Sequence, residues 1–217
     1  PKDGLLIAHL DDANVAEIAA EAPCPVQGYG LNPAHTWAIA DLKADNGATH
    51  FTVLKNGKPW APMTVNLSGR HNCLNSLAVT ATLHHLGVMA ETISEGLVSF
   101  EGVKRRQEVR GIEKGITVID DFAHHPTAVQ ETLAGLKAAY PNRRLIAVFE
   151  PRTNSSRRAI FQRDYVFAFD AADLIILREP VPLEGLATEE LFSSTRLAKD
   201  LREERHLPAE ALTDTDE

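Results

Sequence analysis

Apolar positions in the N-terminal half of the chain fall in short runs, and segments with helical spacing separate these runs. Residues 5–8 (LLIA) form an apolar run that predicts a buried strand, and residues 26–29 predict a second strand. Between them, apolar residues recur on one face of a predicted helix that extends to about Ala22, and Asp12 can cap its first turn. The pattern therefore predicts a strand–helix–strand unit at the start of the chain.

Residues 36–67 change to an alternating pattern that two Asn-Gly pairs interrupt. Asn46-Gly47 and Asn56-Gly57 are dipeptides that favour the tight turns of β-hairpins. We therefore predict a three-stranded antiparallel meander, with strands at residues 36–44, 49–55 and 59–67. Helical spacing then resumes in a helix that Gly87 can end, and a second helix is predicted over residues 90–100.

From Gly115 onward, apolar runs and helical segments alternate strictly. Such alternation is typical of an α/β domain with a largely parallel sheet. The predicted strands cover residues 116–120, 144–149 and 173–178, and the predicted helices cover residues 127–139, 157–171 and 188–204. The fold class is therefore α/β, with two domains at residues 1–95 and 96–217.

Composition narrows the classes of function. The chain has 217 residues, of which 44% are hydrophobic, so it can bury a sizeable core. Its formal net charge of −8 argues against nucleic acid or a membrane surface as a partner. Two cysteines without a C-x-x-C motif exclude a disulfide scaffold and a cysteine zinc site. The sequence contains no signal peptide or long apolar run, so we expect a cytoplasmic location.

Two polar stretches follow neighbouring predicted strands. "DDFAHHPT" at residues 120–127 ends the strand 116–120, and "EPRTNSSRR" at residues 150–158 ends the strand 144–149. Ligands of open α/β sheets bind at the carboxyl ends of the strands. We therefore expect both stretches to line one cleft.

Metal and serine-nucleophile chemistry fit these stretches poorly. Adjacent side chains diverge, so His124 and His125 are badly placed to chelate one ion, and the H-x-x-x-H spacing of a helical site is absent. The sequence also lacks the G-x-S-x-G motif of a nucleophilic serine. We predict no metal ligand among these residues.

A nucleotide together with an anionic substrate fits them better. A carboxylate can accept hydrogen bonds from a ribose diol, and arginines can hold phosphate or carboxylate with two parallel bonds. The phosphate-binding motif G-x-x-x-x-G-K-[ST] is missing, because the only Gly-Lys pair, Gly57-Lys58, lies in a predicted hairpin. The residues alone therefore support two interpretations. One is a partial nucleotide site that lacks the phosphate-binding motif, and the other is a structural α/β domain with a polar rim.

Three motifs together resemble those of the Mur ligase family. "GRHNCLNSLA" at residues 69–78 is similar to the family's G-x-H-N-x-x-N helix start, and "FEGVKRR" at residues 100–106 is similar to its linker into the last domain. "DDFAHHPT" resembles the form found in the members that recognise UDP-N-acetylmuramate. The resemblance implies that residues 1–95 are the C-terminal part of a central ATP-binding domain. Residues 96–217 would be most of a Rossmann-like C-terminal domain, so we expect a C-terminal fragment that is incomplete at its end.

The resemblance also implies a nucleotide site for ATP. Asp121 would bind the ribose, and Arg106 would reach the phosphates. The adenine end would be held by His71, Asn72 and Asn75. The cofactors would be ATP and Mg²⁺, with magnesium ligands mostly outside this chain.

The acceptor side of the site follows from the same resemblance. His124 and His125 would line the cleft where the incoming amine meets an acyl phosphate, as catalytic residues. Pro126 and Thr127 suit the first turn of the following helix, with Thr127 supplying a cap oxygen. Arg152 and Asn154 would bind the incoming substrate.

The reaction implied is an ATP-dependent C–N ligation that yields ADP and phosphate. "EPRTN" is closer to the ligases that add the tripeptide L-alanyl-γ-D-glutamyl-meso-diaminopimelate to UDP-N-acetylmuramate in peptidoglycan recycling than to the alanine-adding ligases, whose pattern is "QPHRYTR". Addition of L-alanine remains the alternative. A non-catalytic nucleotide- or peptide-binding module is the alternative from another class. Because the phosphate-binding motif is absent, we expect these 217 residues alone to be inactive.

Overall fold

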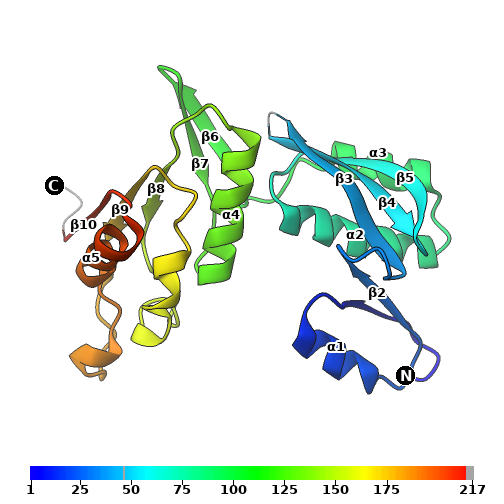
Figure 1. Ribbon diagram of the computed structural model, residues 1–217, viewed down its shortest axis with the longest axis horizontal. Helices are drawn as coiled ribbons and strands as arrows, with labels where there is room; N and C mark the ends of the chain where they lie inside the picture. The colour runs from blue at the N-terminus through cyan, green and yellow to red at the C-terminus, as the bar shows by residue number, and fades with distance from the viewer. Residues whose placement is uncertain (46, 214–217) are drawn as a thin grey trace. The chain divides into compact units, whose positions relative to one another are not determined.

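The computed structural model describes residues 1–45 and 47–213, which fall into two compact units (Figure 1). The first unit is Pro1–Gly102 and the second is Val103–Glu217. Both units combine helices with strands, which confirms the α/β fold class. No helix among the described residues is long and apolar enough to cross a membrane.

The first unit is built on a five-stranded sheet in the order β1-β2-β3-β4-β5. Its strands β1 (Leu6–His9), β2 (Val26–Gly30) and β3 (Trp37–Asp45) run parallel to one another. Strand β4 (Ala48–Lys55) continues it antiparallel to β3, and β5 (Lys58–Val65) pairs antiparallel with β4, which confirms the predicted meander.

The two Asn-Gly pairs lie where the meander turns. Asn56 and Gly57 have φ angles of 52° and 73°, as the tight turn between β4 and β5 requires. At the other turn Gly47 has a φ of 88°, whereas Asn46 lies outside the described residues.

Three helices complete the first unit. Helix α1 (Ala13–Ala20) begins as predicted at Asp12, whose carboxylate accepts hydrogen bonds from the backbone nitrogens of Asn14 and Val15. Helix α2 (Arg70–His85) buries Leu77 against the sheet, and α3 (Ala90–Ser99) packs mainly against β5.

One aromatic cluster joins the sheet of this unit to the C-terminal end of α2. The His84 ring lies 5.0 Å from the Trp37 ring and 5.5 Å from the Trp60 ring. The Lys55 ammonium approaches His84 Nε2 at 2.8 Å and lies over the Trp37 ring. Trp37 is fully buried, so this cluster belongs to the core of the first unit.

The second unit contains two separate sheets. Strands β8 (Ile146–Phe149), β9 (Leu174–Arg178) and β10 (Ala209–Leu212) form a parallel sheet in the order β10-β9-β8. Strand β7 (Ile116–Asp120) pairs instead with β6 (Glu108–Glu113) in an antiparallel hairpin. The expectation that the strands at 116–120 and 144–149 share one sheet is therefore wrong for the described residues.

Strand β6 was not predicted, and its sequence explains why. "KRRQEVRG" is dominated by charged residues, and five of the six β6 positions are exposed, so no apolar alternation marks the strand. The hairpin is closed by Lys114 and Gly115, with φ angles of 49° and 80°.

Helix α4 (Pro126–Ala139) matches the predicted helix at 127–139, but the helix predicted at 157–171 is absent. Short 3₁₀ turns η1 (Ala159–Phe161) and η2 (Asp164–Phe167) occupy that segment. The buried Gln162 side chain donates to the carbonyl of Ser193 and accepts from its backbone nitrogen. This segment is therefore anchored by a distant loop, and local periodicity does not decide its conformation.

Helix α5 (Ser194–Arg205) starts later than the predicted helix at 188–204. The 3₁₀ turn η3 (Thr188–Glu190) precedes it, and the Ser193 hydroxyl caps it by accepting from the backbone nitrogen of Arg196. The core of the second unit gathers around buried Tyr165, Phe169 and Leu197.

Candidate functional site

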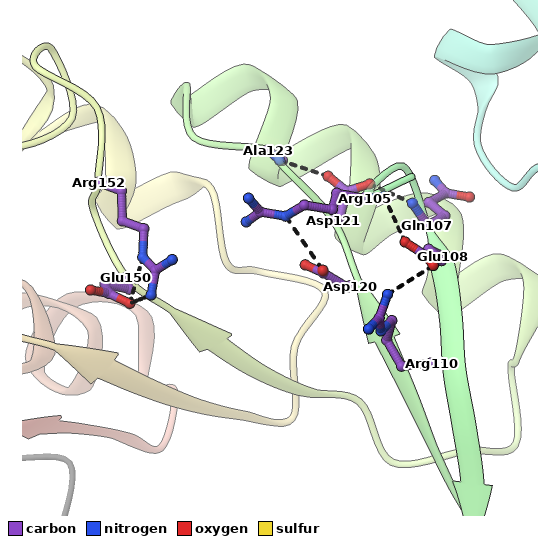
Figure 2. Close-up of polar contacts among 9 residues, drawn as sticks. All are labelled: Arg105, Gln107, Glu108, Arg110, Asp120, Asp121, Ala123, Glu150 and Arg152. Carbon is purple, nitrogen blue, oxygen red and sulfur yellow. Dashed lines mark hydrogen bonds and ion pairs between the residues drawn. The ribbon is translucent and has the colours of Figure 1, made fainter. Parts of the chain in front are cut away.

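Asp121 lies directly after β7, and its carboxylate forms hydrogen bonds with two backbone segments. One carboxylate oxygen accepts from the backbone nitrogen of Ala123 at 2.7 Å, and the other accepts from that of Gln107 at 2.9 Å (Figure 2). Gln107 has a positive φ of 51°, so this bond stabilises an unfavourable turn before β6. A carboxylate oxygen has two lone pairs, so Asp121 keeps acceptor capacity for a ligand.

Asp120, its neighbour, faces a different partner. Its carboxylate lies 3.4 Å from Arg105 Nε, and the Arg105 guanidinium also lies over the Phe122 ring, 5.1 Å from its centre. Arg106, the predicted phosphate contact, is exposed, and within residues 1–45 and 47–213 no ion pair holds its guanidinium. Arg105 therefore stabilises the loop after β7, and Arg106 is left accessible to an anion.

The two histidines are held in different ways. The His124 ring bonds through Nδ1 to the carbonyl of Phe122 at 2.9 Å, and its own carbonyl accepts from the Tyr165 hydroxyl. His125 is the N-cap of α4, because its Nδ1 accepts from the backbone nitrogen of Thr127. The predicted cap oxygen of Thr127 is thus replaced by a ring nitrogen, whereas Pro126 occupies the first turn as expected.

The His125 ring is further fixed by an edge-on contact with Phe161, 4.7 Å away between ring centres. Accepting at Nδ1 leaves Nε2 as the N–H of the neutral ring. The described ranges contain no group of three histidine, cysteine, aspartate or glutamate side chains arranged to hold a metal. These two rings can therefore orient a polar substrate through their outer nitrogens.

The end of β8 carries an ion-pair array centred on Glu150. Arg152 contacts one carboxylate oxygen of Glu150 through Nε at 2.8 Å and Nη2 at 2.7 Å (Figure 2). Arg178, the last residue of β9, bonds the other oxygen through Nη1 at 3.0 Å. One carboxylate thus lies between two guanidiniums at the carboxyl edge of the parallel sheet.

Negative charges around Arg152 affect the pKa of its guanidinium. The hydrogen bond and charge of Glu150 raise the pKa of Arg152, and the charge of Asp120 adds to this effect. The two strands β7 and β8 belong to separate sheets. That both polar stretches line one cleft therefore stays a prediction.

A rigid turn follows Arg152. The Thr153 hydroxyl donates to Ser156 Oγ at 2.8 Å, and Ser156, which is fully buried, also bonds the Thr153 backbone. Asn154 is exposed, and its side-chain oxygen accepts from Arg158 Nε at 3.0 Å. The turn therefore presents Arg152 and Asn154 from a fixed backbone.

The predicted adenine-binding residues begin α2 in the first unit. Gly69 is the N-cap residue, with a φ of 98° and no capping side chain. The Asn72 amide nitrogen donates to the carbonyl of Ser68 at 2.7 Å, whereas Asn75 is exposed and His71 is partly buried. Asn72 can therefore offer a ligand mainly its oxygen, and Asn75 can offer both a donor and an acceptor.

Sequence reasoning singled out Arg152 and weighed Glu150 as its ion-pair partner, but it missed Arg178. Arg178 belongs to no motif, and it is the polar residue that ends the apolar strand β9. Since β8 and β9 are parallel neighbours, their carboxyl ends meet at the same edge of the sheet. That rule was the available signal for pairing Glu150 with Arg178.

Comparison with known families matches both units. Residues 1–83 match the family "Mur ligase middle domain", and residues 105–216 match the family "Mur ligase, glutamate ligase domain".

Curated relatives match most of the chain. The UDP-N-acetylmuramate–L-alanine ligase of Caldanaerobacter subterraneus subsp. tengcongensis is 38% identical over 82% of this chain and 39% of its own length. The ligase of the same name from Desulfotalea psychrophila is 37% identical over 96% of this chain and 46% of its own length. The chain thus spans less than half of the length of these relatives.

Solved structures are similar as well. The UDP-N-acetylmuramate–alanine ligase of Thermotoga maritima has a TM-score of 0.75 at 23% identity, over 97% of this chain and 43% of that one, which shows a shared fold. A murein peptide ligase from Psychrobacter arcticus has a TM-score of 0.64 at 29% identity, over 100% of this chain and 44% of that one.

Proposed function

The chain belongs to the Mur ligase family, and from this premise we propose that it is part of an ATP-dependent ligase acting on UDP-N-acetylmuramate. The observation that carries the proposal is the tandem match of two family domains, together with "DDFAHHPT" at the end of β7. Residues 1–102 would contribute to the central ATP-binding domain, and residues 103–217 would form the C-terminal domain.

The proposed reaction proceeds through an acyl phosphate. The UDP-N-acetylmuramate carboxylate attacks the γ-phosphorus of ATP, and ADP leaves. The acceptor amine then attacks the acyl carbon, phosphate leaves with the C–O bond electrons, and the amine loses a proton. Mg²⁺, when bound, neutralises phosphate charge. The chain's own residues position the reactants and exclude wrong orientations.

Several side chains suit the nucleotide. Asp121 is rigidly oriented and keeps free lone pairs for a ribose hydroxyl. The exposed Arg106 guanidinium can meet a phosphate with two parallel bonds. Of the predicted adenine contacts, Asn75 offers the fuller hydrogen-bonding edge, with His71 and Asn72 beside it in sequence.

The acceptor that we propose is the tripeptide L-alanyl-γ-D-glutamyl-meso-diaminopimelate, which would place the enzyme in peptidoglycan recycling. The array of Arg152, Glu150 and Arg178 supports this choice, because such a peptide carries several carboxylates. His124 and His125 would line the path of the amine, and Asn154 would contact the peptide. The resemblance to the Psychrobacter arcticus murein peptide ligase supports the same choice.

L-Alanine is the second candidate acceptor. The curated relatives described above are L-alanine ligases that are 37–38% identical to this chain. Both candidates share the UDP-sugar, ATP and the acyl phosphate, and they differ only in the amine. Because the reaction consumes cytosolic ATP, we propose a cytoplasmic location with no nucleic-acid or membrane partner.

Ligation by the complete gene product tests the proposal. The protein is incubated with ATP, Mg²⁺, UDP-N-acetylmuramate and either the tripeptide or L-alanine, and the products are identified by mass spectrometry. We expect the UDP-sugar–tripeptide conjugate and one ADP for each bond formed. Exclusive use of alanine would replace the proposed acceptor with the second candidate. ATP-independent binding without any ligation would favour a non-catalytic binding module and refute the ligase.

A further inference from the structure

The turn between β4 and β5 presents an Asn-Gly pair to solvent. Asn56 and Gly57 are both exposed, and their φ angles of 52° and 73° place both residues in the left-handed region. In the part of the chain that the structure describes, no hydrogen bond holds the Gly57 nitrogen or the Asn56 side-chain amide. A side-chain amide and the next backbone nitrogen are therefore adjacent and accessible in this turn.

Glycine at the second turn position leaves its own nitrogen unshielded. Gly57 has no Cβ, and a glycine changes its backbone conformation at low cost. The space beside it is open as well, since the nearest atom to a Cβ placed there would be the Pro33 carbonyl oxygen at 3.8 Å. The Gly57 nitrogen can therefore approach the Asn56 side chain when the turn opens.

Two lysines flank the pair. Lys55 and Lys58 lie directly opposite each other in the register of β4 and β5. A positive charge favours the anionic form of a neighbouring group, so the lysines favour loss of the proton from the Gly57 nitrogen. Like charges that face each other across two strands also destabilise the strand pairing. The lysines therefore favour both the reactive form of the nitrogen and opening of the turn.

We propose that Asn56 is a site of spontaneous covalent modification through a succinimide. The Gly57 nitrogen loses its proton and attacks the side-chain carbonyl carbon of Asn56, so that a new N–C bond closes a ring. The C–N bond of the side-chain amide breaks, and its nitrogen takes up a proton and leaves as ammonia. Water then adds to either carbonyl carbon of the ring, and the ring opens to aspartate or to isoaspartate.

The two products affect the first unit in different ways. Aspartate keeps the backbone unchanged and places a negative charge between Lys55 and Lys58. Isoaspartate adds a methylene group to the backbone between residues 56 and 57, and the length of a hairpin turn fixes the register of its strands. The longer backbone disturbs the hydrogen bond from the Asn56 nitrogen to the Thr36 carbonyl at 2.8 Å, which anchors the turn just before β3.

Peptide mapping of the 217-residue chain tests the proposal. The folded chain is incubated in buffers of rising pH and digested, and the peptides that contain Asn56 and Asn142 are quantified by mass spectrometry. Asn142 is the matched control, because it is exposed in a turn but precedes Arg143, whose nitrogen donates to the Tyr140 carbonyl at 3.0 Å. We expect conversion at Asn56 to be at least about tenfold faster than at Asn142 and to accelerate with pH, because the attacking nitrogen must lose its proton.

Hydrogen exchange at the backbone amide of residue 56 distinguishes the two products. The measurement compares the unmodified chain, the Asn56→Asp variant and the isoaspartyl form, which chromatography separates after the incubation. Asn56→Asp carries the new charge without the added methylene group, so we expect its protection to stay within about twofold of the unmodified chain. The isoaspartyl form should lose protection at least about tenfold, because its turn no longer fits the register.

Equal conversion at Asn56 and Asn142, or conversion at Asn56 that does not change with pH, would refute a succinimide at this turn. Loss of protection in Asn56→Asp as large as in the isoaspartyl form would refute the effect assigned to the longer backbone. Neither result bears on ligation, because the turn lies outside the residues proposed for ATP and the acceptor.

Discussion

At the scale of single residues, Asp121 has a structural task that its motif does not reveal. The motif assigns it to a nucleotide, whereas the structure shows its two oxygens holding the backbone of Gln107 and Ala123. Backbone contacts of this kind depend on a turn that sequence periodicity does not describe. The position of Asp121 at a strand end was predictable, and its partner before β6 was not, because β6 itself carries no apolar pattern.

We expect Asp121→Asn to lower the free energy of unfolding by about 1.5–3 kcal/mol, since a charged acceptor with two backbone donors becomes a neutral amide with one oxygen. Asp120→Asn should cost only about 0–1 kcal/mol, because its pair with Arg105 is largely exposed. Urea denaturation of the two variants measures the difference. Equal losses would contradict the role of Asp121 as a backbone fastener.

The same pair of variants tests the proposed binding of ATP by Asp121 in the complete ligase. Asp121→Asn should raise the KM for ATP more than Asp120→Asn, because the side chains of neighbouring strand residues face opposite ways. The assay is run where both variants are fully folded, so that stability does not mimic binding. Equal effects on the KM for ATP would count against the ribose assignment.

At the scale of elements, the sequence predicted regular segments well and anchored segments poorly. The hairpin turn at Asn56-Gly57 and the cap at Asp12 obey local rules, and both were found where expected. The segment at 157–171 failed because its conformation depends on Gln162 and a loop more than thirty residues away. Long-range side-chain anchors of this kind leave no local signature.

Gln162→Ala should therefore destabilise the second unit. The change leaves the backbone N–H of Ser193 without its partner, which costs about 1–3 kcal/mol, whereas the carbonyl of Ser193 still accepts from the backbone nitrogen of Leu197. Gln130→Ala on the exposed face of α4 is the matched control, expected to stay within about 0.5 kcal/mol. Thermal unfolding followed by circular dichroism compares them, and similar melting temperatures would disprove the anchor.

At the scale of the whole molecule, the parts of the proposed ligase site that these 217 residues include decide what this chain can do alone. Its 217 residues include the side chains that we propose for the adenine, the ribose and the acceptor, but no G-x-x-x-x-G-K-[ST] motif for the β- and γ-phosphates. Without that cradle the transferred phosphoryl group is not held in line with its acceptor.

We accordingly predict that the purified 217-residue chain does not ligate. The assay supplies ATP, Mg²⁺, UDP-N-acetylmuramate and tripeptide, and measures phosphate release and conjugate formation. Both should stay at the level of a reaction without protein. Ligation above that level would show that the missing motif is dispensable.

The aromatic cluster around His84 confines tryptophan fluorescence to the first unit. Trp37 and Trp60 are the only tryptophans in the sequence, and both contact the His84 ring. Burial, together with the charges of Lys55 and His85, lowers the pKa of His84 below its ordinary 6.5. As the pH falls below 6.5, the unfolded chain takes up the proton first, so this group reduces the stability of the folded state.

A protonated imidazole quenches indole emission, so the protein carries its own optical pH probe. We expect tryptophan emission to titrate with a midpoint below 6.5, and His84→Gln to abolish the titration. His85→Gln is the matched control and should retain it. Because all tryptophan emission originates in residues 1–102, its change with denaturant under tryptophan-selective excitation reports the unfolding of that unit, and the other unit must be followed by a different signal.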